Sequence, residues 1–190
     1  MGKVVVSQFI TLDGVVEDPG GSEDLDRGGW AFKFERGDEG DQFKLDELMS
    51  SDALLLGRTT YEGFAEAWPS RKGEFADKFN SMAKYVVSTT LGDPEWNNST
   101  VIGGDEIADR VAELKGAVDG DILVNGSVQL VRALVEHDLV DEYRLMVFPT
   151  VLGEGKRLFG ESETSADLKL KDSRPAGDTL ILIYEPAPKE

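Results

Sequence analysis

The segment at residues 53–68 constrains the fold more than any other part of the chain, because its character changes at a single glycine. It reads ALLLGRTTYEGFAEAW. The apolar run before Gly57 has no polar alternation, which is typical of a strand buried on both faces. The residues after Gly57 carry apolar side chains at helical spacing. A buried strand that leads directly into a helix is the building unit of a parallel sheet covered by helices.

Strand-like and helix-like segments alternate through the middle of the chain. Their periodicity predicts strands at residues 3–10, 52–57, 84–89, 99–103, 121–127 and 141–152, and helices at residues 41–50, 60–68, 75–82, 107–116 and 128–137. The period-2 alternation of an antiparallel hairpin follows at residues 167–173 and 178–186. A length of 190 residues suits one domain. We therefore expect a single α/β domain over residues 1–190, a three-layer αβα structure with a mixed, mostly parallel sheet and an antiparallel C-terminal hairpin.

Composition argues against several classes of binding partner. The 37 acidic and 20 basic residues give a formal net charge of −17, which repels nucleic-acid backbones. The chain contains no cysteine, so an intracellular, cytoplasmic setting is expected. No apolar run approaches the ~20 residues that cross a membrane, so no membrane contact is expected. With His137 as the only histidine, neither a metal site nor a Ser-His-Asp triad is expected.

The corner after the buried strand carries groups that suit a phosphate. Gly57 lets a ligand approach the backbone, Arg58 adds a positive charge, and Thr59 and Thr60 offer hydroxyl groups. A helix that begins here presents free N–H groups and the positive end of its dipole. The corner therefore predicts a phosphate site, and a plain turn with a threonine cap is the alternative.

Two further corners repeat this arrangement. Asn125, Gly126 and Ser127 end the strand predicted at residues 121–127, directly before a predicted helix, and Ser88 and Thr89 end the strand at residues 84–89. Because the carboxyl ends of parallel strands meet at one edge of a sheet, three such corners could hold different parts of one dinucleotide. For each hydroxyl group, a capped turn is the alternative.

Residues 18–40 predict a long loop. The segment is rich in glycine and acidic residues and is interrupted by an apolar cluster of Trp30, Phe32 and Phe34. Loops of this length usually bind something or are mobile. Trp30 is therefore a candidate to cover a substrate, and a small satellite core around it is the alternative.

The common nucleotide-binding motifs do not match. No G-x-G-x-x-G follows the first strand, which argues against an ordinary Rossmann fingerprint. The segment GEGKRLF at residues 153–159 has neither the leading glycine nor the hydroxyl residue of a Walker A loop.

The motifs that do match resemble the dihydrofolate-reductase-like superfamily. They are LLLGRTTYEGF, the opening QFITLDGVV, and the later DILVNGSVQLVRALVEHDLVDEYRLMVFPTVLGEGKRLF. Within the superfamily the chain is most similar to the reductase domain of the bifunctional riboflavin-biosynthesis enzyme RibD. The resemblance runs from residue 3 to residue 159, and its later part is the more specific.

This resemblance implies that NADPH binds across the carboxyl edge of the sheet. The residues it assigns to the cofactor are Phe9, Val16, Gly57, Arg58, Thr59, Thr60, Ser88, Thr89, Asn125, Gly126, Ser127 and Val128. Ser88 and Thr89 would lie near the 2′-phosphate, and Gly126 near the pyrophosphate. Asp13 is the candidate for handling a proton, with an Asx turn as the alternative. Asp41 stands where a dihydrofolate reductase places its substrate carboxylate, with a helix N-terminal acid as the alternative.

Two functions remain open from the sequence. The first is an oxidoreductase that transfers hydride from NADPH to a small planar heterocyclic or carbonyl substrate. The second is a protein of the same fold that binds a nucleotide or another small molecule without turnover. The apolar faces of residues 128–135 and 142–152, together with the resemblance, also predict a C2 homodimer.

Overall fold

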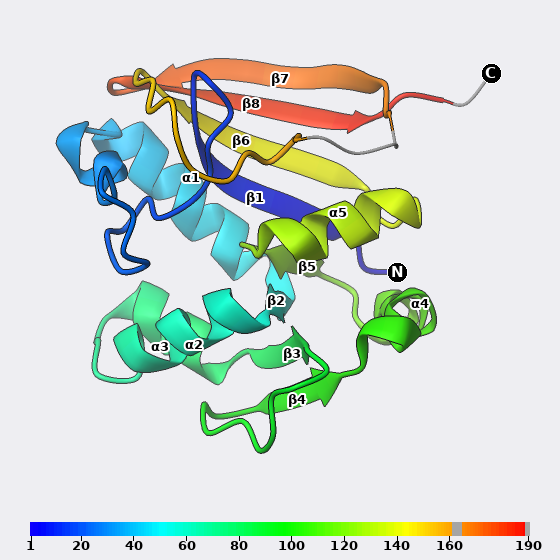
Figure 1. Ribbon diagram of the computed structural model, residues 1–190. Coiled ribbons are helices and arrows are strands. Elements are labelled where there is room, and N and C mark those ends of the chain that lie inside the picture. The colour runs from blue at the N-terminus through cyan, green and yellow to red at the C-terminus, as the bar shows by residue number, and fades with distance from the viewer. Residues whose placement is uncertain (161–164, 189–190) are drawn as a thin grey trace.

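The computed structural model describes residues 1–160 and 165–188, which form one mixed sheet and its covering helices (Figure 1). The strands are β1 (Val4–Thr11), β2 (Ser51–Gly57), β3 (Ala83–Val87), β4 (Ser99–Ile102), β5 (Asp121–Val124), β6 (Glu142–Phe148), β7 (Leu168–Ala176) and β8 (Thr179–Pro186). The helices are η1 (Trp30–Lys33), α1 (Gly37–Met49), α2 (Arg58–Ala67), α3 (Glu74–Ser81), η2 (Gly104–Glu106), α4 (Ile107–Ala117) and α5 (Val128–Glu136).

The strand order is β4-β3-β2-β5-β1-β6-β8-β7. Neighbours from β4 to β6 are parallel, and β8 pairs antiparallel with both β6 and β7. Figure 1 shows β7 at one edge of the sheet and β4 at the other. The predicted mixed, mostly parallel sheet with an antiparallel C-terminal pair is therefore confirmed.

Helices cover both faces of the sheet, and alternate residues of a strand pack against the two helical layers. Val5 of β1 packs with Leu48 of α1 and Phe79 of α3, whereas Val4 packs with Val111 of α4 and Leu134 of α5. Residues 53–57 of β2 are buried without exception, as the unbroken apolar run predicts. This burial on both faces produces the three-layer arrangement.

The ends of several predicted elements were wrong. The helix expected at residues 41–50 begins at Gly37. Its first turn packs against Ala176 through Gly40. Glycine has no apolar side chain, so the sequence pattern did not show this turn as part of the helix. The strand expected at residues 141–152 ends at Phe148, before Pro149. Beyond it, residues 150–156 pair with residues 12–16 instead of continuing the sheet.

A third apolar cluster lies under the long loop. Trp30 is fully buried there, and its ring is 5.3 Å from that of Phe148 in an edge-on arrangement. Trp30 Nε1 donates to the carbonyl oxygen of Glu17 at 2.9 Å. Of the two interpretations of this aromatic cluster, the structure shows the satellite core for Trp30, while Phe32 is 81 % exposed.

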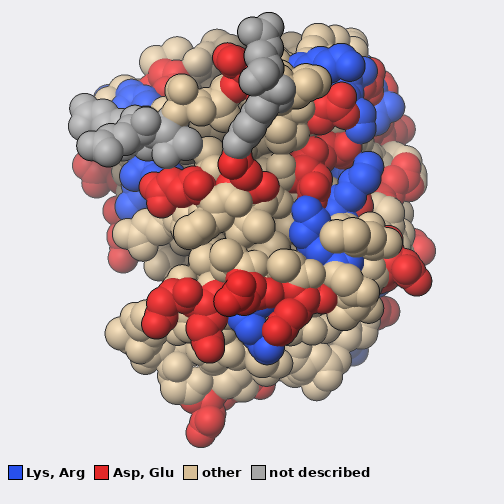
Figure 2. Space-filling view, turned by 90° about the vertical axis from the view of Figure 1, so that its right-hand side faces the viewer, with Lys and Arg blue, Asp and Glu red and all other residues tan. Residues whose placement is uncertain are grey.

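Charge is unevenly spread over the face of the molecule that Figure 2 shows. On the face in Figure 2, acidic and basic side chains mix over the upper part, and a band of acidic side chains crosses the lower part. Among the described residues, no helix is long and apolar enough to cross a membrane.

Candidate functional site

The corner after β2 touches the corner after β5. The backbone N–H of Gly57 donates to the carbonyl oxygen of Gly126 at 3.0 Å. A Cβ at Gly57 would overlap the side chain of Ser127, and a Cβ at Gly126 would lie 2.6 Å from Thr60 Oγ1. Gly126 has a φ of 134°, a value that L side chains rarely adopt, and the peptide bond after it is cis. The two corners can approach this closely only because both carry glycine.

Two helices begin at this contact. α2 starts at Arg58, directly after Gly57, and α5 starts at Val128, after its cap Ser127. Ser127 Oγ accepts a hydrogen bond from the N–H of Leu130 at 3.4 Å, whereas no side chain in the described part of the chain caps α2. The positive ends of two helix dipoles and their free N–H groups therefore lie close together, which suits the phosphate groups of one ligand.

The corner after β3 is joined to the first by Arg58. The guanidinium donates from Nη1 to Thr90 Oγ1 at 2.7 Å and from Nε to Glu62 Oε1 at 2.8 Å. Ser88 Oγ accepts the N–H of Thr90 at 3.2 Å, and Thr89 is exposed beside it. The structure therefore brings the predicted cation and the predicted hydroxyl groups to one place. Thr90, the residue after the predicted Ser88 and Thr89, makes the direct contact with Arg58.

The end of β1 lies at the same edge of the sheet, since β1 is the parallel neighbour of β5. The Phe9 ring is partly buried and lies 5.1 Å from that of Phe148. Val16 is buried, and its N–H donates to the carbonyl oxygen of Lys156 at 3.0 Å. Of these two residues, both of which the resemblance assigns to the cofactor, Phe9 remains partly accessible, while Val16 holds two loops together.

Asp13 also holds these loops together. Its carboxylate accepts hydrogen bonds from Thr11 Oγ1 at 2.6 Å and from the N–H groups of Leu152 and Gly153 at 3.2 and 2.8 Å. The hydrogen bond from Thr11, with those from the two backbone N–H groups, lowers the pKa of Asp13 to about 2. Asp13 is therefore an ionised loop anchor at neutral pH, an arrangement that does not favour the predicted role in proton transfer.

The structure gives the two predicted substrate residues other roles. Trp30 is enclosed in the satellite core and exposes no surface to a ligand. Asp41 lies in the first half of α1, where its 64 % exposed side chain pairs with Arg36 at 2.7 Å. This geometry matches the alternative of an acid near a helix N-terminus.

A buried polar cluster beside the second corner was missed by sequence reasoning. Asn125 Nδ2 donates to the carbonyl oxygen of Ser7 at 3.4 Å, and Ser7 Oγ contacts both Lys44 and Glu47 of α1. In the sequence, Lys44 and Glu47 have the spacing of an ordinary surface ion pair. The one signal that could have found the cluster is Ser7, a polar residue inside the apolar run of β1.

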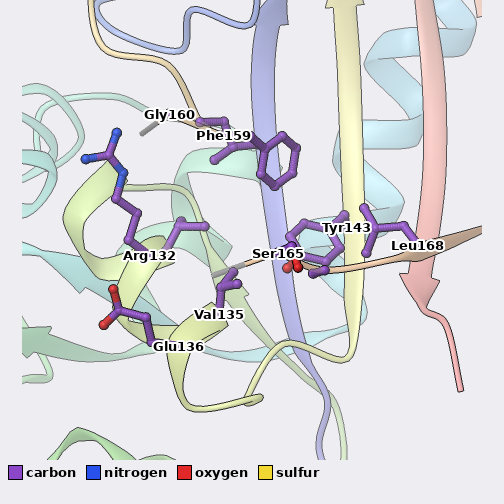
Figure 3. A pocket seen from close by; sticks show the side chains of 11 residues that line it. Arg132, Val135, Glu136, Tyr143, Phe159, Gly160, Ser165 and Leu168 are labelled. Atoms are coloured by element: carbon purple, nitrogen blue, oxygen red, sulfur yellow. The ribbon is translucent and has the colours of Figure 1, made fainter. Parts of the chain in front are cut away.

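Two hollows lie elsewhere on the molecule. One, of about 340 Å³, lies between α5, the start of β6 and the segment after β6; Figure 3 shows Val135, Tyr143, Phe159 and Leu168 around it, with Arg132 and Glu136 at its edge. The other, of about 800 Å³, lies between α2 and residues 91–97. Within the described residues, no group of three or more histidine or acidic side chains could hold a metal ion.

Comparison with known proteins identifies the family. The chain matches the RibD C-terminal domain over residues 2–182. It is 28 % identical to the uncharacterized protein YyaP of Bacillus subtilis over 186 residues, which cover 95 % of this chain and 93 % of YyaP. A putative riboflavin biosynthesis protein from Shewanella sp. PV-4 has the same fold, with a TM-score of 0.77 and 24 % identity over 99 % of this chain and all of that one.

A pyrimidine reductase-like protein from Corynebacterium diphtheriae also shares the fold. Its TM-score is 0.65 and its identity 13 %, with 99 % of this chain and 93 % of that chain covered. Because the family match spans nearly the whole sequence, the protein belongs to the RibD C-terminal domain family.

Proposed function

We propose that this protein is an NADPH-dependent oxidoreductase that reduces a small planar heterocyclic or carbonyl compound. The observation that carries the proposal is the contact between Gly57 and Gly126, where the N-termini of α2 and α5 converge. A dinucleotide with a pyrophosphate and a third phosphate is the kind of ligand that such an arrangement suits. Membership of a family that includes reductase domains supports the same ligand.

The residues at the corners fit the charged parts of NADPH. The first-turn N–H groups of α5 would hold the pyrophosphate near Gly126, Ser127 and Val128. Arg58 would meet the 2′-phosphate with Ser88, Thr89 and Thr90, because its guanidinium is already held at Thr90. When bound, the cofactor supplies the hydride. The protein orients the nicotinamide along the end of β1 near Phe9 and excludes water.

The test is a titration with NADPH followed by an assay of turnover. Quenching of the fluorescence of the three tryptophans reports binding, and absorbance at 340 nm reports oxidation of NADPH with a panel of aldehydes, ketones and pyrimidines. Binding together with oxidation on any member of the panel supports the proposal. Binding without oxidation on all of them favours the non-catalytic alternative. No binding of NADPH contradicts both the cofactor and the reductase function.

A further inference from the structure

The face of the sheet under α1 contains a polar cluster at its centre. Ser7 and Glu47 are each only 3 % exposed, and Ser7 Oγ donates to Glu47 Oε1 at 2.8 Å. Lys44 Nζ donates to Ser7 Oγ at 2.7 Å and also contacts Glu47 Oε1. Because burying charged groups costs free energy, a cluster of this kind is weak evidence for stability and calls for another explanation.

The carboxylate of Glu47 is fixed from two sides. Lys44 reaches it from one turn earlier on α1, and Arg144 Nη1 lies 3.9 Å from its second oxygen. Arg144 is itself held by Glu142 at 2.7 Å and by Asp121 at 2.8 Å. These contacts leave Glu47 little freedom, so the Lys44 ammonium is held in one position.

This position lies next to the proposed cofactor site. Ser7, which contacts Lys44, also accepts the side-chain N–H of Asn125, the residue that precedes Gly126. Lys44 Nζ is 5.5 Å from the centre of the Phe9 ring, and the Lys44 side chain is 14 % exposed. One chain of contacts therefore connects the ammonium to the glycine corner, and part of the Lys44 side chain remains open to solvent.

Some of the hydrogen-bonding capacity of the cluster is unused. Glu47 Oε2 and Asn125 Oδ1 are buried and have no hydrogen-bond partner within the described part of the chain. Buried polar atoms are almost always paired, so an unpaired atom beside a proposed site is a place where a bound molecule is expected. An ammonium has three N–H groups, and those of Lys44 are not all used by Ser7 and Glu47.

We propose that Lys44 contacts the substrate and donates the proton that accompanies hydride transfer to a carbonyl group. This inference rests on the proposed function, with NADPH as the source of hydride. As the carbonyl carbon accepts the hydride, the π-electron pair of C=O moves to oxygen. The oxygen takes a proton from Lys44 Nζ, so an N–H bond breaks and an O–H bond forms. The neutral amine then regains a proton from water.

Glu47 acts in this scheme as a positioning residue. Its carboxylate holds the ammonium against Ser7. Glu47→Gln keeps the shape of the side chain but removes its charge. We expect this change to lower kcat by about tenfold or more, because proton donation is impaired, while KM changes less. A residue with only a structural role would change neither.

The experiment uses benzaldehyde as the reducible probe and benzoate as a probe that binds without turnover. Lys44→Met removes the ammonium, Lys44→Arg keeps a charged donor that cannot give up its proton, and Lys72→Met is the control at an exposed lysine. Turnover is followed at 340 nm with saturating NADPH. Benzoate binding is followed by saturation-transfer NMR, and NADPH affinity and thermal unfolding are measured for every variant.

We expect Lys44→Met to lower turnover of benzaldehyde by about 10²–10⁴-fold and to lose benzoate binding, with NADPH affinity unchanged. Lys44→Arg should keep benzoate binding while turnover stays low, and Lys72→Met should behave as wild type. Turnover of Lys44→Met within threefold of wild type would overturn the inference. Wild-type protein that binds NADPH but neither reduces benzaldehyde nor binds benzoate would overturn it too. Failure to bind NADPH would instead contradict the proposed function.

Discussion

At the scale of single residues, Lys84 shows how the fold accommodates a buried cation without a carboxylate contact among the described residues. Its ammonium is fully buried and donates to the carbonyl oxygens of Asn80, Met82 and Asn97 at 2.8, 2.8 and 2.9 Å. It also lies 4.3 Å from the centre of the Trp96 ring. Burial lowers the pKa of Lys84 from 10.5 to about 8. The carbonyl groups and the indole ring partly offset the cost of burying its charge.

This pKa predicts a dependence of stability on pH. Between pH 8 and 10.5 the unfolded chain binds a proton at Lys84 that the folded chain has released. The free energy of unfolding should therefore rise with pH in this window, by at most about 1.4 kcal/mol per unit. Urea unfolding at pH 7.5, 8.5 and 9.5 measures the slope. All three pH values lie well below the pKa of Tyr143, which burial raises to about 12.

Lys84→Met is the control for this prediction. Methionine fills a similar volume and does not titrate, so its free energy of unfolding should lack the rise attributed to Lys84. Equal slopes for wild type and Lys84→Met would show that the rise comes from another group.

Arg58 should decide the preference between the two nicotinamide cofactors. The net charge of −17 repels NADPH more than NADH, so a preference for NADPH needs a local cation. A hydrogen bond to a charged group contributes roughly 1.5–3 kcal/mol, so Arg58→Ala should weaken NADPH by about ten- to a hundredfold. NADH should change much less, because it has no 2′-phosphate. Titrating wild type and Arg58→Ala with NADPH and with NADH measures the difference. An equal loss of affinity for the two cofactors would place Arg58 at the pyrophosphate instead.

At the scale of elements, the corner between β2 and α2 depends on close packing. A Cβ at Gly57 would lie 2.8 Å from Ser127 Cβ and 3.0 Å from its backbone nitrogen, neither of which is the flexible end of a side chain. Gly57→Ala should therefore lower the free energy of unfolding by about 1–3 kcal/mol and weaken NADPH binding. Denaturant unfolding and fluorescence titration measure the two effects.

Gly63 in the same helix provides the matched control. A Cβ there would meet nothing within 4 Å, so Gly63→Ala should stabilise the protein by about 0.5–1 kcal/mol through helix propensity and leave NADPH binding unchanged. A Gly57→Ala variant as stable as Gly63→Ala, with native NADPH affinity, would show that the packing of the two corners is not critical.

The same elements show what the sequence could predict. The ends of α5 were predicted to within one residue and those of α2 to within two, because a buried apolar run, a glycine and an amphipathic pattern are local signals. The first turn of α1 was missed, because Gly40 packs inward without an apolar side chain. The contact between Gly57 and Gly126 depends on β2 and β5 being neighbours, which no local pattern encodes.

The candidate site was predictable only where local sequence patterns place its residues. Arg58, Ser88 and Gly126 were placed at strand ends from local pattern, and the structure brings their corners to one edge. Lys44 and Glu47 were not predicted, because their burial depends on how α1 lies over the sheet, and in the sequence they look like a surface pair. The role of Trp30 was ambiguous, because an aromatic residue in a loop can either cover a bound substrate or belong to a small hydrophobic core.

At the scale of the whole molecule, we propose a C2 homodimer. The hollow between α5 and the start of β6 is lined largely by apolar side chains, and Phe159 at its edge is 53 % exposed. An exposed apolar surface on a strongly charged chain is typical of an interface. Light scattering at micromolar concentration should give twice the chain mass of 20.8 kDa. A mass of 20.8 kDa would contradict the dimer.

The central claim, that the start of α2 and the start of α5 hold NADPH together, can be tested most directly by NMR. Amide resonances of ¹⁵N-labelled protein are followed during a titration with NADPH. The amides of Arg58, Thr59 and Thr60 and those of Ser127 and Val128 should shift and saturate with one common Kd, while that of Gly116 in α4 should not move. Shifts confined to one corner, or two corners that saturate with different Kd values, would contradict the claim.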